Sequence, residues 1–401
     1  MLKNANLLVL SHQYYSFIKD QVEEISAHFR HVDVLVRYKP IAEISSFLPV
    51  EGLKRHRKRS VIVLAGVPEN VRVIPVPLYY LPTDSGYKRL GKKHYRAVRR
   101  MIAKHDIQPD LAHAHFTWSA GYAGARLREE TGIPFVLTAH GYDIYDLPFR
   151  DAEWRENIKY VLDRADEVIT VSASNLKCVR ELGTEKPVHV IPNGVNLKLF
   201  YPRESGECRR VLGLPTDRKI VLAVGRLAEI KGQRYLVEAV GQLVSYRHDV
   251  ICYIVGGGEL RKRLDRQVRE AGLQDYVKLA GARPYHEIPL WMSACDLFAL
   301  SSLRESFGVA QVEALACGKP VVATYNGGSE SIVTSEDYGY LVEAANPGAL
   351  CGKMLVALDR EWKREHLLNH ALRFSWKEVT KRIIDIYESL LDQGGEPGRE
   401  R

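Results

Sequence analysis

Short apolar runs alternate with amphipathic stretches of helical length along this 401-residue chain. The alternation is typical of βαβ units, in which helices cover both faces of a parallel sheet. In the first half, the pattern predicts strands at residues 7–10, 32–36, 71–76, 111–114, 135–138, 168–171 and 188–191, and helices at 17–29, 87–104, 119–130, 152–164 and 174–181. The rhythm restarts with predicted strands at 220–224, 251–255, 277–280, 297–300 and 321–323. The sequence therefore predicts an α/β fold with two doubly wound, Rossmann-like domains.

A polar stretch that carries Pro202 and Gly206 separates the two halves. It predicts an interdomain linker at 196–209, between an N-terminal domain at 1–195 and a C-terminal domain at 210–374. Ser375 and Glu378 form a capping box that opens a predicted helix at 375–391, and the polar, Gly-rich tail at 392–401 is expected to be disordered. Two such domains in series are expected to face a cleft, with the carboxyl ends of both sheets open to ligands.

The composition is that of an ordinary globular protein, with 46% hydrophobic and 26% charged residues. No apolar run approaches the roughly 18 residues needed to span a bilayer, and the apolar segment at 6–10 is too short for a signal peptide. The six cysteines are tens of residues apart and include no C-x-x-C pair. This spacing argues against a zinc knuckle or a disulfide framework and favours buried, reduced thiols in a cytoplasmic protein.

Positive charge is concentrated between Leu53 and His105, where fourteen lysines and arginines stand against two acids, Glu69 and Asp84. The net charge of this segment is +12 in a chain whose total is +8, so the remainder is acidic. Tyrosines lie among the cations, and tyrosine suits a membrane–water interface. We expect the segment to bind an anionic membrane surface peripherally on its inner face. The alternative is a basic surface that aids solubility or binds a soluble anionic glycan.

Two loops that follow predicted strands of the second half carry groups suited to a diphosphate. The first begins at Gly225 and holds the cations Arg226 and Lys231 within eight residues. Arginine forks onto two phosphate oxygens, and lysine acts as a point charge. The second loop has three consecutive glycines centred on Gly257, which let another molecule approach the backbone closely. Taken singly, a solvated basic loop and a flexible turn would also explain these two segments.

The strongest single signal is the segment R-E-S-F-G-V at 304–309, which leads into a predicted helix at 310–316. The amides of Ser306, Phe307 and Gly308 occupy the N-terminus of this helix, where free N–H groups and the helix dipole favour an anion. Glu305 precedes this cradle and Glu313 follows it by about two turns. Two glutamates beside a phosphate need hydroxyls to accept from, and a nucleotide sugar supplies them through its sugar ring and its ribose. The alternative is that Glu305 caps the helix and Glu313 is a solvated surface residue.

Three histidines in the first half follow or lie within predicted strands. The strand at 135–138 runs into Ala139 and His140, so we expect the imidazole of His140 to be a functional group at the carboxyl end of a strand. His113 and His115 lie two residues apart on one face of an earlier strand. That spacing could hold a metal ion, but no third ligand is evident nearby. Structural, hydrogen-bonded histidines are therefore the preferred interpretation of that pair.

Together these residues resemble the large family of retaining glycosyltransferases called family 4, whose members have the two-domain GT-B fold. The resemblance runs from about His113 to Leu391. Its motifs are T-x-H-G-x-D at 138–143, I-P-N-G-V at 191–195, G-R-L-x-x-x-K-G at 225–232, and E-x₇-E at 305–313. Many members carry a Gly-Gly pair just after the first strand, where this chain has S-H-Q-Y-Y-S at 11–16. This departure bears on how an acceptor would be placed.

The resemblance implies a role for each candidate residue. Arg226 and Lys231 look like the pair that neutralises the diphosphate of the donor. Glu313 resembles the glutamate that accepts the ribose hydroxyls, and Glu305 the one that contacts hydroxyls of the transferred sugar. His140 would lie near that sugar and the departing phosphate. The resemblance also implies a nucleotide-sugar donor, no metal or other cofactor, and a C-terminal helix that crosses back onto the N-terminal domain.

We therefore expect a retaining glycosyltransferase that moves a sugar from a UDP- or GDP-sugar to a glycan or lipid-linked acceptor, in cell-surface polysaccharide, glycolipid or glycoprotein biosynthesis. Its transition state separates a charged diphosphate from a sugar with oxocarbenium character, so cations and amides at the leaving group matter most.

Three alternatives are open. A sugar-nucleotide epimerase of the same fold would need no acceptor, and a phosphorylase would need a lysine motif for pyridoxal phosphate. A nucleic-acid-binding protein would explain the basic segment but not the donor loops, and no nucleic acid is expected.

Overall fold

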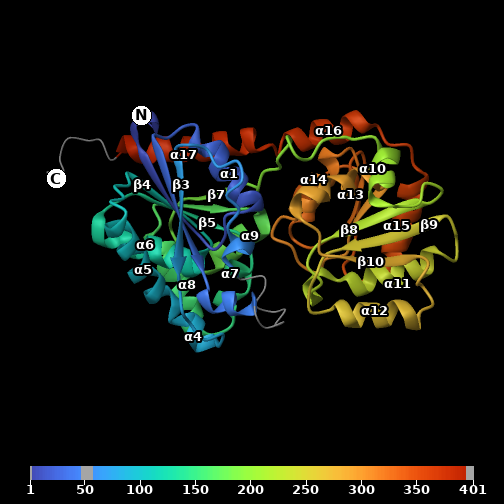
Figure 1. Cartoon of the computed structure of the whole chain (residues 1–401), viewed down its shortest axis with the longest axis horizontal. Helices are drawn as coiled ribbons and strands as arrows, with labels where there is room; N and C mark the ends of the chain where they lie inside the picture. Colours follow the sequence, from blue (N-terminus) through green and yellow to red (C-terminus); the bar gives the residue numbers. More distant parts are fainter. Residues whose placement is uncertain (1, 47–56, 394–401) are drawn as a thin grey trace. The chain divides into compact units, whose positions relative to one another are not determined.

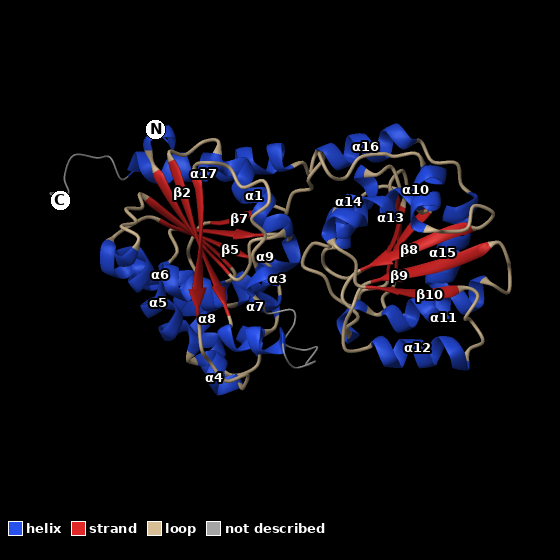
Figure 2. Ribbon diagram, in the orientation of Figure 1, coloured by secondary structure: helices blue, strands red, loops and turns tan. Residues whose placement is uncertain are grey.

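The computed structural model describes residues 2–46 and 57–393, which form two compact units. The N-terminal unit runs to Pro192 and resumes at Val379, and the C-terminal unit is Asn193–Glu378. Each unit is built around one parallel sheet with helices on both faces (Figures 1 and 2). Among the described residues, no helix is long and apolar enough to cross a bilayer.

Within the described residues, the N-terminal sheet has seven parallel strands in the order β3-β2-β1-β4-β5-β6-β7. In chain order these are β1 (Asn6–Ser11), β2 (His31–Tyr38), β3 (Val71–Pro77), β4 (Leu111–His115), β5 (Phe135–Ala139), β6 (Glu167–Thr170) and β7 (Val188–Val190). The helices of this unit are α1 (Ser16–Ser26), α3 (Lys58–Val61), α4 (Asp84–Lys88), α5 (Leu90–Lys104), α6 (Tyr122–Thr131), α7 (Tyr142–Tyr145), α8 (Ala152–Arg164), α9 (Ala173–Glu181) and most of α17 (Trp376–Gln393). The strand order reverses between β1 and β4, which makes their carboxyl ends the switch point of this sheet.

The helices of the N-terminal unit attach through apolar side chains at helical spacing. On α5, the buried residues Leu90, His94 and Val98 recur every four positions, so that the basic residues between them face solvent. Helices α5, α6 and α8 close a core around Trp118 and Trp154 on one face of the sheet. Burial of these large rings provides much of the apolar stabilisation of this unit.

The C-terminal unit, which the structure describes throughout, has six parallel strands in the order β10-β9-β8-β11-β12-β13. The strands are β8 (Lys219–Val224), β9 (Val250–Val255), β10 (Val277–Gly281), β11 (Leu297–Leu300), β12 (Val321–Thr324) and β13 (Gly339–Val342). The helices are α10 (Ser205–Leu212), α11 (Gln233–Leu243), α12 (Arg261–Glu270), α13 (Ile288–Ala294), α14 (Val309–Ala316), α15 (Pro347–Asp359) and α16 (Arg364–Leu372). Here the order reverses between β8 and β11. This is the strand order of a dinucleotide-binding fold, and the two-domain α/β prediction is confirmed.

Helix α17 begins in the C-terminal unit and continues into the N-terminal unit from Val379 onward. In the N-terminal unit, the Tyr387 ring packs edge-on against Phe29, and the Arg382 side chain donates a hydrogen bond to the carbonyl of Val190 at 2.6 Å. The serine half of the predicted capping box is present at its start, since the Ser375 hydroxyl accepts from the Glu378 N–H at 3.3 Å. This is the crossover helix that the resemblance implied.

The structure differs from the predicted elements in several places. Helix α10 lies partly inside the predicted linker at 196–209, because the Glu204 carboxylate caps its first N–H groups and Arg209 forms an ion pair with Asp296 at 2.6 Å. Strand β13 was not predicted, since it is short and begins at a glycine. Only glycine fits at position 339, because a Cβ there would lie 1.8 Å from the Val321 carbonyl oxygen. The predicted helix at 87–104 is two helices, α4 and α5, and the predicted tail at 394–401 lies outside the described residues.

Five of the six cysteines are buried, as the composition predicted. Burial raises the pKa of the Cys252, Cys295 and Cys317 thiols to about 12. These three thiols are therefore protonated and unreactive at neutral pH.

Candidate functional site

The predicted donor-site residues lie in loops that follow β8, β9 and β11 and on α14, around the switch point between β8 and β11 of the C-terminal sheet. A cavity of about 10 Å³ lies between these loops, and Gly225, Lys231, Ser301 and Ser302 are among the residues that line it. Ligands of open α/β sheets bind at this edge. The fold therefore brings two segments about 75 residues apart to one place.

Lys231 and Glu305 form an ion pair in this place. The Lys231 Nζ donates to Glu305 Oε1 at 2.5 Å, and the Ser302 hydroxyl donates to the same oxygen at 2.7 Å. Only 9% of the Glu305 side chain and 29% of the Lys231 side chain are exposed. A carboxylate this well buried needs such partners, because an unpaired charge there would be costly. Among the described residues, the second carboxylate oxygen of Glu305 has no hydrogen-bond donor, and Lys231 has further donor capacity.

The backbone of Glu305 is fixed by a polar loop that the sequence analysis did not single out. Its N–H donates to the Asn326 carbonyl at 2.9 Å. The Asn326 side chain, itself buried, accepts from the N–H groups of Gly328 and Ser329 and donates to the Ser329 hydroxyl. The signal was available as N-G-G two residues after a predicted strand, which is a strong turn pattern.

Glycines in these loops allow backbone segments of the chain to approach one another. Gly232 has φ +60°, and a Cβ there would lie 2.1 Å from the Ser301 carbonyl oxygen. At Gly258, a Cβ would likewise lie only 2.3 Å from the Leu227 carbonyl oxygen. Gly257, between two such glycines, is exposed and meets only ordinary contacts. Two glycines of the triplet therefore serve loop packing, and Gly257 is the member with an accessible face.

Arg226 lies in the same loop as Lys231 but has different surroundings. Its guanidinium is 3.4 Å from the Glu259 carboxylate, and both side chains are more than half exposed. An exposed pair of this kind contributes little to stability. The Arg226 side chain is therefore available to an anionic ligand at small cost.

The segment before α14 offers backbone donors. Among the described residues, the N–H groups of Ser306, Phe307 and Gly308 have no hydrogen-bond acceptor. Gly308 caps the helix with φ +86°, and the Phe307 ring is buried against Phe374 with ring centroids 5.7 Å apart. The buried ring fixes the loop while its amides stay free. Free amides at a helix N-terminus can bind a phosphate.

Glu313 is not a solvated surface residue. It is buried on α14, and its Oε1 accepts a hydrogen bond from the Tyr285 hydroxyl at 3.0 Å. Tyr285 was not among the predicted site residues, and it packs against Phe200 with ring centroids 5.5 Å apart. No local pattern links Tyr285 to Glu313, which lies 28 residues later.

The histidines predicted in the N-terminal half form one buried cluster. His113 hydrogen-bonds through Nδ1 to the Tyr387 hydroxyl at 2.5 Å and through Nε2 to Thr138 at 2.7 Å. Both of its ring nitrogens are thus engaged, which favours the structural interpretation over a metal ligand. His115 Nδ1 lies 2.9 Å from His140 Nε2, and the His140 ring packs against Phe116. His115 therefore orients His140, and His140 is the member next to the loop that follows β5.

Burial also keeps the rings of His113 and His115 neutral. It lowers the pKa of His115 to about 3, and it lowers the pKa of His113 well below the usual value, with smaller contributions from His115 and His140. In α5, burial followed by the charge of Arg37 lowers the pKa of His94 to about 3. A neutral imidazole both donates and accepts, as the paired rings require.

Acid should therefore destabilise the N-terminal unit well above pH 3. The unfolded chain protonates His94 and His115 near pH 6.5, whereas the folded chain does so only near the depressed value of about 3. Unfolding thus takes up protons in this window, so the free energy of unfolding should fall by about 2 kcal/mol per histidine between pH 6.5 and 5. Urea unfolding followed by tryptophan fluorescence at the two pH values measures this loss. His94→Gln should flatten the dependence, and equal wild-type stability at both pH values would contradict it.

The loop after β1 is where the resemblance predicted a difference. His12 stacks on Phe116 with ring centroids 4.6 Å apart, and its Nε2 accepts from the Ser119 N–H at 3.1 Å. Tyr14 is buried and pairs through its backbone with Val61. Bulky, engaged side chains therefore occupy the segment in which many family members have two glycines.

Fewer cations of the predicted basic segment are exposed in the described structure than its net charge suggested. Lys54, Arg55 and His56 lie outside the described residues, and Arg57 is buried. Lys88 is enclosed by three carboxylates. The remaining cations lie mainly on the exposed face of α5, where they are Lys92, Lys93, Arg96, Arg99, Arg100 and Lys104.

Family models match both units. Residues 204–373 match the model described as "Glycosyl transferases group 1", and residues 51–199 match "Glycosyltransferase Family 4". Among curated proteins, D-inositol 3-phosphate glycosyltransferase of Corynebacterium jeikeium is 33% identical over 313 residues, covering 72% of this chain and 74% of that protein. An uncharacterised glycosyltransferase of Methanocaldococcus jannaschii is 30% identical over 302 residues, covering 74% and 80%.

Solved structures show the same architecture. Sucrose-phosphate synthase from Thermosynechococcus elongatus superposes with a TM-score of 0.78 at 26% identity, covering 97% of this chain and 100% of that one. Anabaena HepE in complex with UDP-glucose superposes with a TM-score of 0.71 at 22% identity, covering 96% and 100%. The chain therefore belongs to glycosyltransferase family 4, and its two Rossmann-like units are those of the GT-B fold.

Proposed function

We propose that this glycosyltransferase retains the anomeric configuration, needs no metal ion, and transfers a sugar from a UDP- or GDP-sugar to a glycan or lipid-linked acceptor. The observation that carries the proposal is the Lys231–Glu305 pair beside the free amides of residues 306–308, at the switch point of the C-terminal sheet. The structure of HepE in complex with UDP-glucose supports a nucleotide-sugar donor in this fold.

In this proposal, the donor diphosphate binds the amides before α14 together with Lys231 and Arg226. These groups would stabilise the charge that grows on the leaving diphosphate as the sugar acquires oxocarbenium character. Glu305 would orient the sugar through its hydroxyls, and Glu313 would accept the ribose hydroxyls. His140, held by His115, would act beside the sugar. Attack from the face that the diphosphate leaves, assisted by that diphosphate, would retain the configuration.

A ligand screen tests the donor assignment. The melting temperature of the full chain should rise with UDP- or GDP-sugars in the presence of EDTA, because a ligand at about 100 times its Kd adds about 2.7 kcal/mol to the free energy of unfolding. The stabilising donor is then incubated with candidate acceptors, and NMR identifies the anomer of the product. Stabilisation only after a metal ion is added would reject metal independence, and an inverted product would reject retention. An epimerised donor formed without an acceptor would reject the transfer reaction.

We further propose that the N-terminal unit docks peripherally on the inner face of an anionic membrane. Support comes from α5, where Lys92, Arg96, Arg100 and Lys104 are exposed and have no ion-pair partner among the described residues. Arg99, by contrast, is paired with Glu130. Each basic residue near an anionic surface contributes about 1 kcal/mol, so four give reversible docking.

Charge removal on α5 should therefore abolish vesicle binding. The variant Lys92→Gln/Arg96→Gln/Arg100→Gln should lose sedimentation with phosphatidylglycerol vesicles, and wild-type binding should weaken steeply as salt rises. A matched control replaces three exposed cations of α12, Arg261, Lys262 and Arg266, in the same way. Equal wild-type binding to neutral and anionic vesicles, or none to either at low salt, would contradict the membrane proposal and leave the donor assignment unaffected.

A further inference from the structure

The N-terminal unit has a pocket of about 370 Å³ that none of the predicted site residues lines. It lies where β2 and β3 end, next to the start of α7. Its lining includes Arg37, Lys39, Tyr80, Tyr87, Tyr142 and Arg150. A concave surface with several convergent polar groups is the usual form of a small-molecule site.

Two cations in this pocket have no carboxylate partner among the residues that the structure describes. Arg37 donates from Nη1 to the Tyr80 hydroxyl at 3.1 Å, but its buried Nε has no acceptor there. The Lys39 Nζ lies 4.1 Å from the centroid of the Tyr80 ring. A buried guanidinium N–H without an acceptor destabilises the free protein, and an anion that accepts from it removes that cost.

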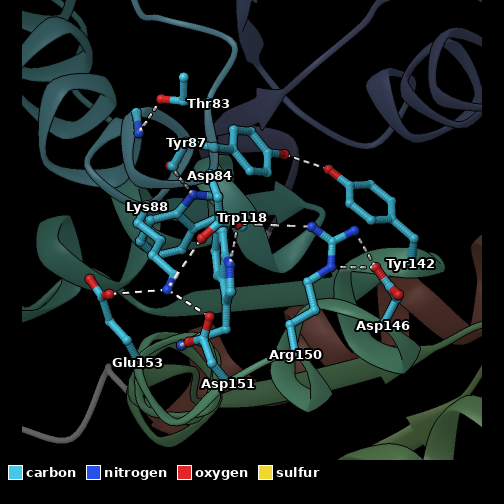
Figure 3. Close-up of polar contacts among 12 residues, drawn as sticks. Thr83, Asp84, Tyr87, Lys88, Trp118, Tyr142, Asp146, Arg150, Asp151 and Glu153 are labelled. Atoms are coloured by element: carbon cyan, nitrogen blue, oxygen red, sulfur yellow. Dashed lines mark hydrogen bonds and ion pairs between the residues drawn. The ribbon is translucent and has the colours of Figure 1, made fainter.

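Four acids near the pocket, of which Asp84 lines it, group around Lys88 and Arg150 (Figure 3). Asp84, Asp151 and Glu153 surround Lys88 at 3.3, 2.7 and 3.1 Å. Asp146 pairs with Arg150 at 2.6 Å. None of these four acids forms an ion pair with Arg37 or Lys39.

Tyrosines complete the walls of the pocket. Tyr87 and Tyr142 both line it, and their hydroxyls hydrogen-bond to each other (Figure 3). Burial alone would raise the pKa of the Tyr80 hydroxyl, but Arg37 and Lys39 lower it below its usual value. Such rings offer apolar faces with polar tips, which suit the mixed surface of a polyhydroxylated ring.

We propose that this pocket binds a phosphate monoester carried by the acceptor, with Arg37 and Lys39 on the phosphate oxygens and the tyrosines around the attached ring. A phosphate monoester carries a charge of about −1.5 to −2 at pH 7, which two free cations balance, whereas a carboxylate would balance only one. The inference rests on the proposed transferase function and names its acceptor class. It assigns the phosphate to the N-terminal unit, whereas the donor loops belong to the C-terminal unit.

Calorimetry on the full chain tests the pocket directly, without need of transfer. D-inositol 3-phosphate and inorganic phosphate are the probes, and myo-inositol is the uncharged control ligand. We expect the phosphorylated probes alone to bind, with affinity reduced at least tenfold by Lys39→Gln and by Arg37→Gln. Lys353→Gln is the matched control, because Lys353 lies 4.5 Å from the ring centroid of Tyr340 in a similar pair outside the pocket.

Lys39→Gln keeps the test valid if Arg37→Gln fails to fold, because Lys39 forms no ion pair among the described residues. Binding of neither phosphorylated probe, or binding that Lys39→Gln leaves unchanged, would overturn the proposal. Donor binding is measured in parallel by thermal shift with UDP- and GDP-sugars. Loss of that signal with phosphate binding intact would reject the proposed function alone, whereas intact donor binding with no effect of Lys39→Gln would reject the pocket alone.

Vesicles distinguish a lipid source of the phosphate from a soluble one. Phosphatidic acid presents a phosphate monoester, and phosphatidylglycerol vesicles of equal surface charge present only a diester. Stronger sedimentation with phosphatidic acid that Lys39→Gln removes would support a lipid-borne phosphate. Equal sedimentation with both vesicles, together with Lys39-dependent binding of D-inositol 3-phosphate, would support a soluble acceptor.

Discussion

Replacing Lys231 with alanine should lower kcat/KM for sugar transfer at least 100-fold, a loss of about 2.7 kcal/mol of transition-state stabilisation. The proposed function assigns Lys231 to the leaving diphosphate, and the structure adds a second reason. Lys231 is the cation 2.5 Å from the buried carboxylate of Glu305. Without it, Glu305 keeps only the Ser302 hydroxyl on that oxygen, and its negative charge would repel the diphosphate.

Arg226→Ala is the comparison for this prediction, because Arg226 lies in the same loop with an exposed partner, Glu259. It should lose about tenfold in kcat/KM, since a cation held in solvent is easier to replace. Steady-state kinetics with varied donor, together with melting temperatures of both variants, separates lost catalysis from lost folding. Near-normal kinetics in a folded Arg226→Ala/Lys231→Ala double variant would remove both residues from the diphosphate site.

Much of the fold could be predicted from hydrophobic periodicity, because parallel strands buried on both faces leave continuous apolar runs in the sequence. All predicted strands are present within about a residue or two of their ends. β13 was missed because Gly339 permits a backbone approach that only the neighbouring strand reveals. The helical part of the linker was missed because α10 depends on Arg209 reaching Asp296, a contact across 87 residues.

The site could be predicted only as separate loops. Position after a strand, glycines and charge identified Lys231 and Glu305, but their pairing follows from the adjacency of β8 and β11, which no local pattern contains. The same is true of Tyr285 beside Glu313 and of Tyr387 beside His113, which lie 274 residues apart. Likewise, only the structure shows that Arg37 has no carboxylate partner among the described residues, because the nearby acids group around Lys88 and Arg150 instead.

Glu305 and Glu313 should respond to substitution in different ways, because their surroundings differ. Glu313 is buried on α14 with the Tyr285 hydroxyl as a donor, which suits a fixed acceptor for ribose hydroxyls. Glu313→Ala should therefore weaken binding of the free nucleoside diphosphate and of the nucleotide sugar, each at least tenfold, or about 1.4 kcal/mol. Tyr285→Phe, which removes only the hydroxyl, should have a smaller effect of the same kind.

Glu305→Ala should instead leave binding of the nucleoside diphosphate intact, or tighten it, because Lys231 is then released from its pair to face the diphosphate. Transfer should still fall at least 100-fold, since the sugar loses the carboxylate that orients its hydroxyls. Calorimetry with the nucleoside diphosphate and with the nucleotide sugar, followed by kinetics on the same preparations, separates the two glutamates. Glu270→Gln is the matched control, because Glu270 is an exposed glutamate at the end of α12 that should affect neither quantity strongly. Weaker nucleoside diphosphate binding in Glu305→Ala but not in Glu313→Ala would show that the two roles are reversed.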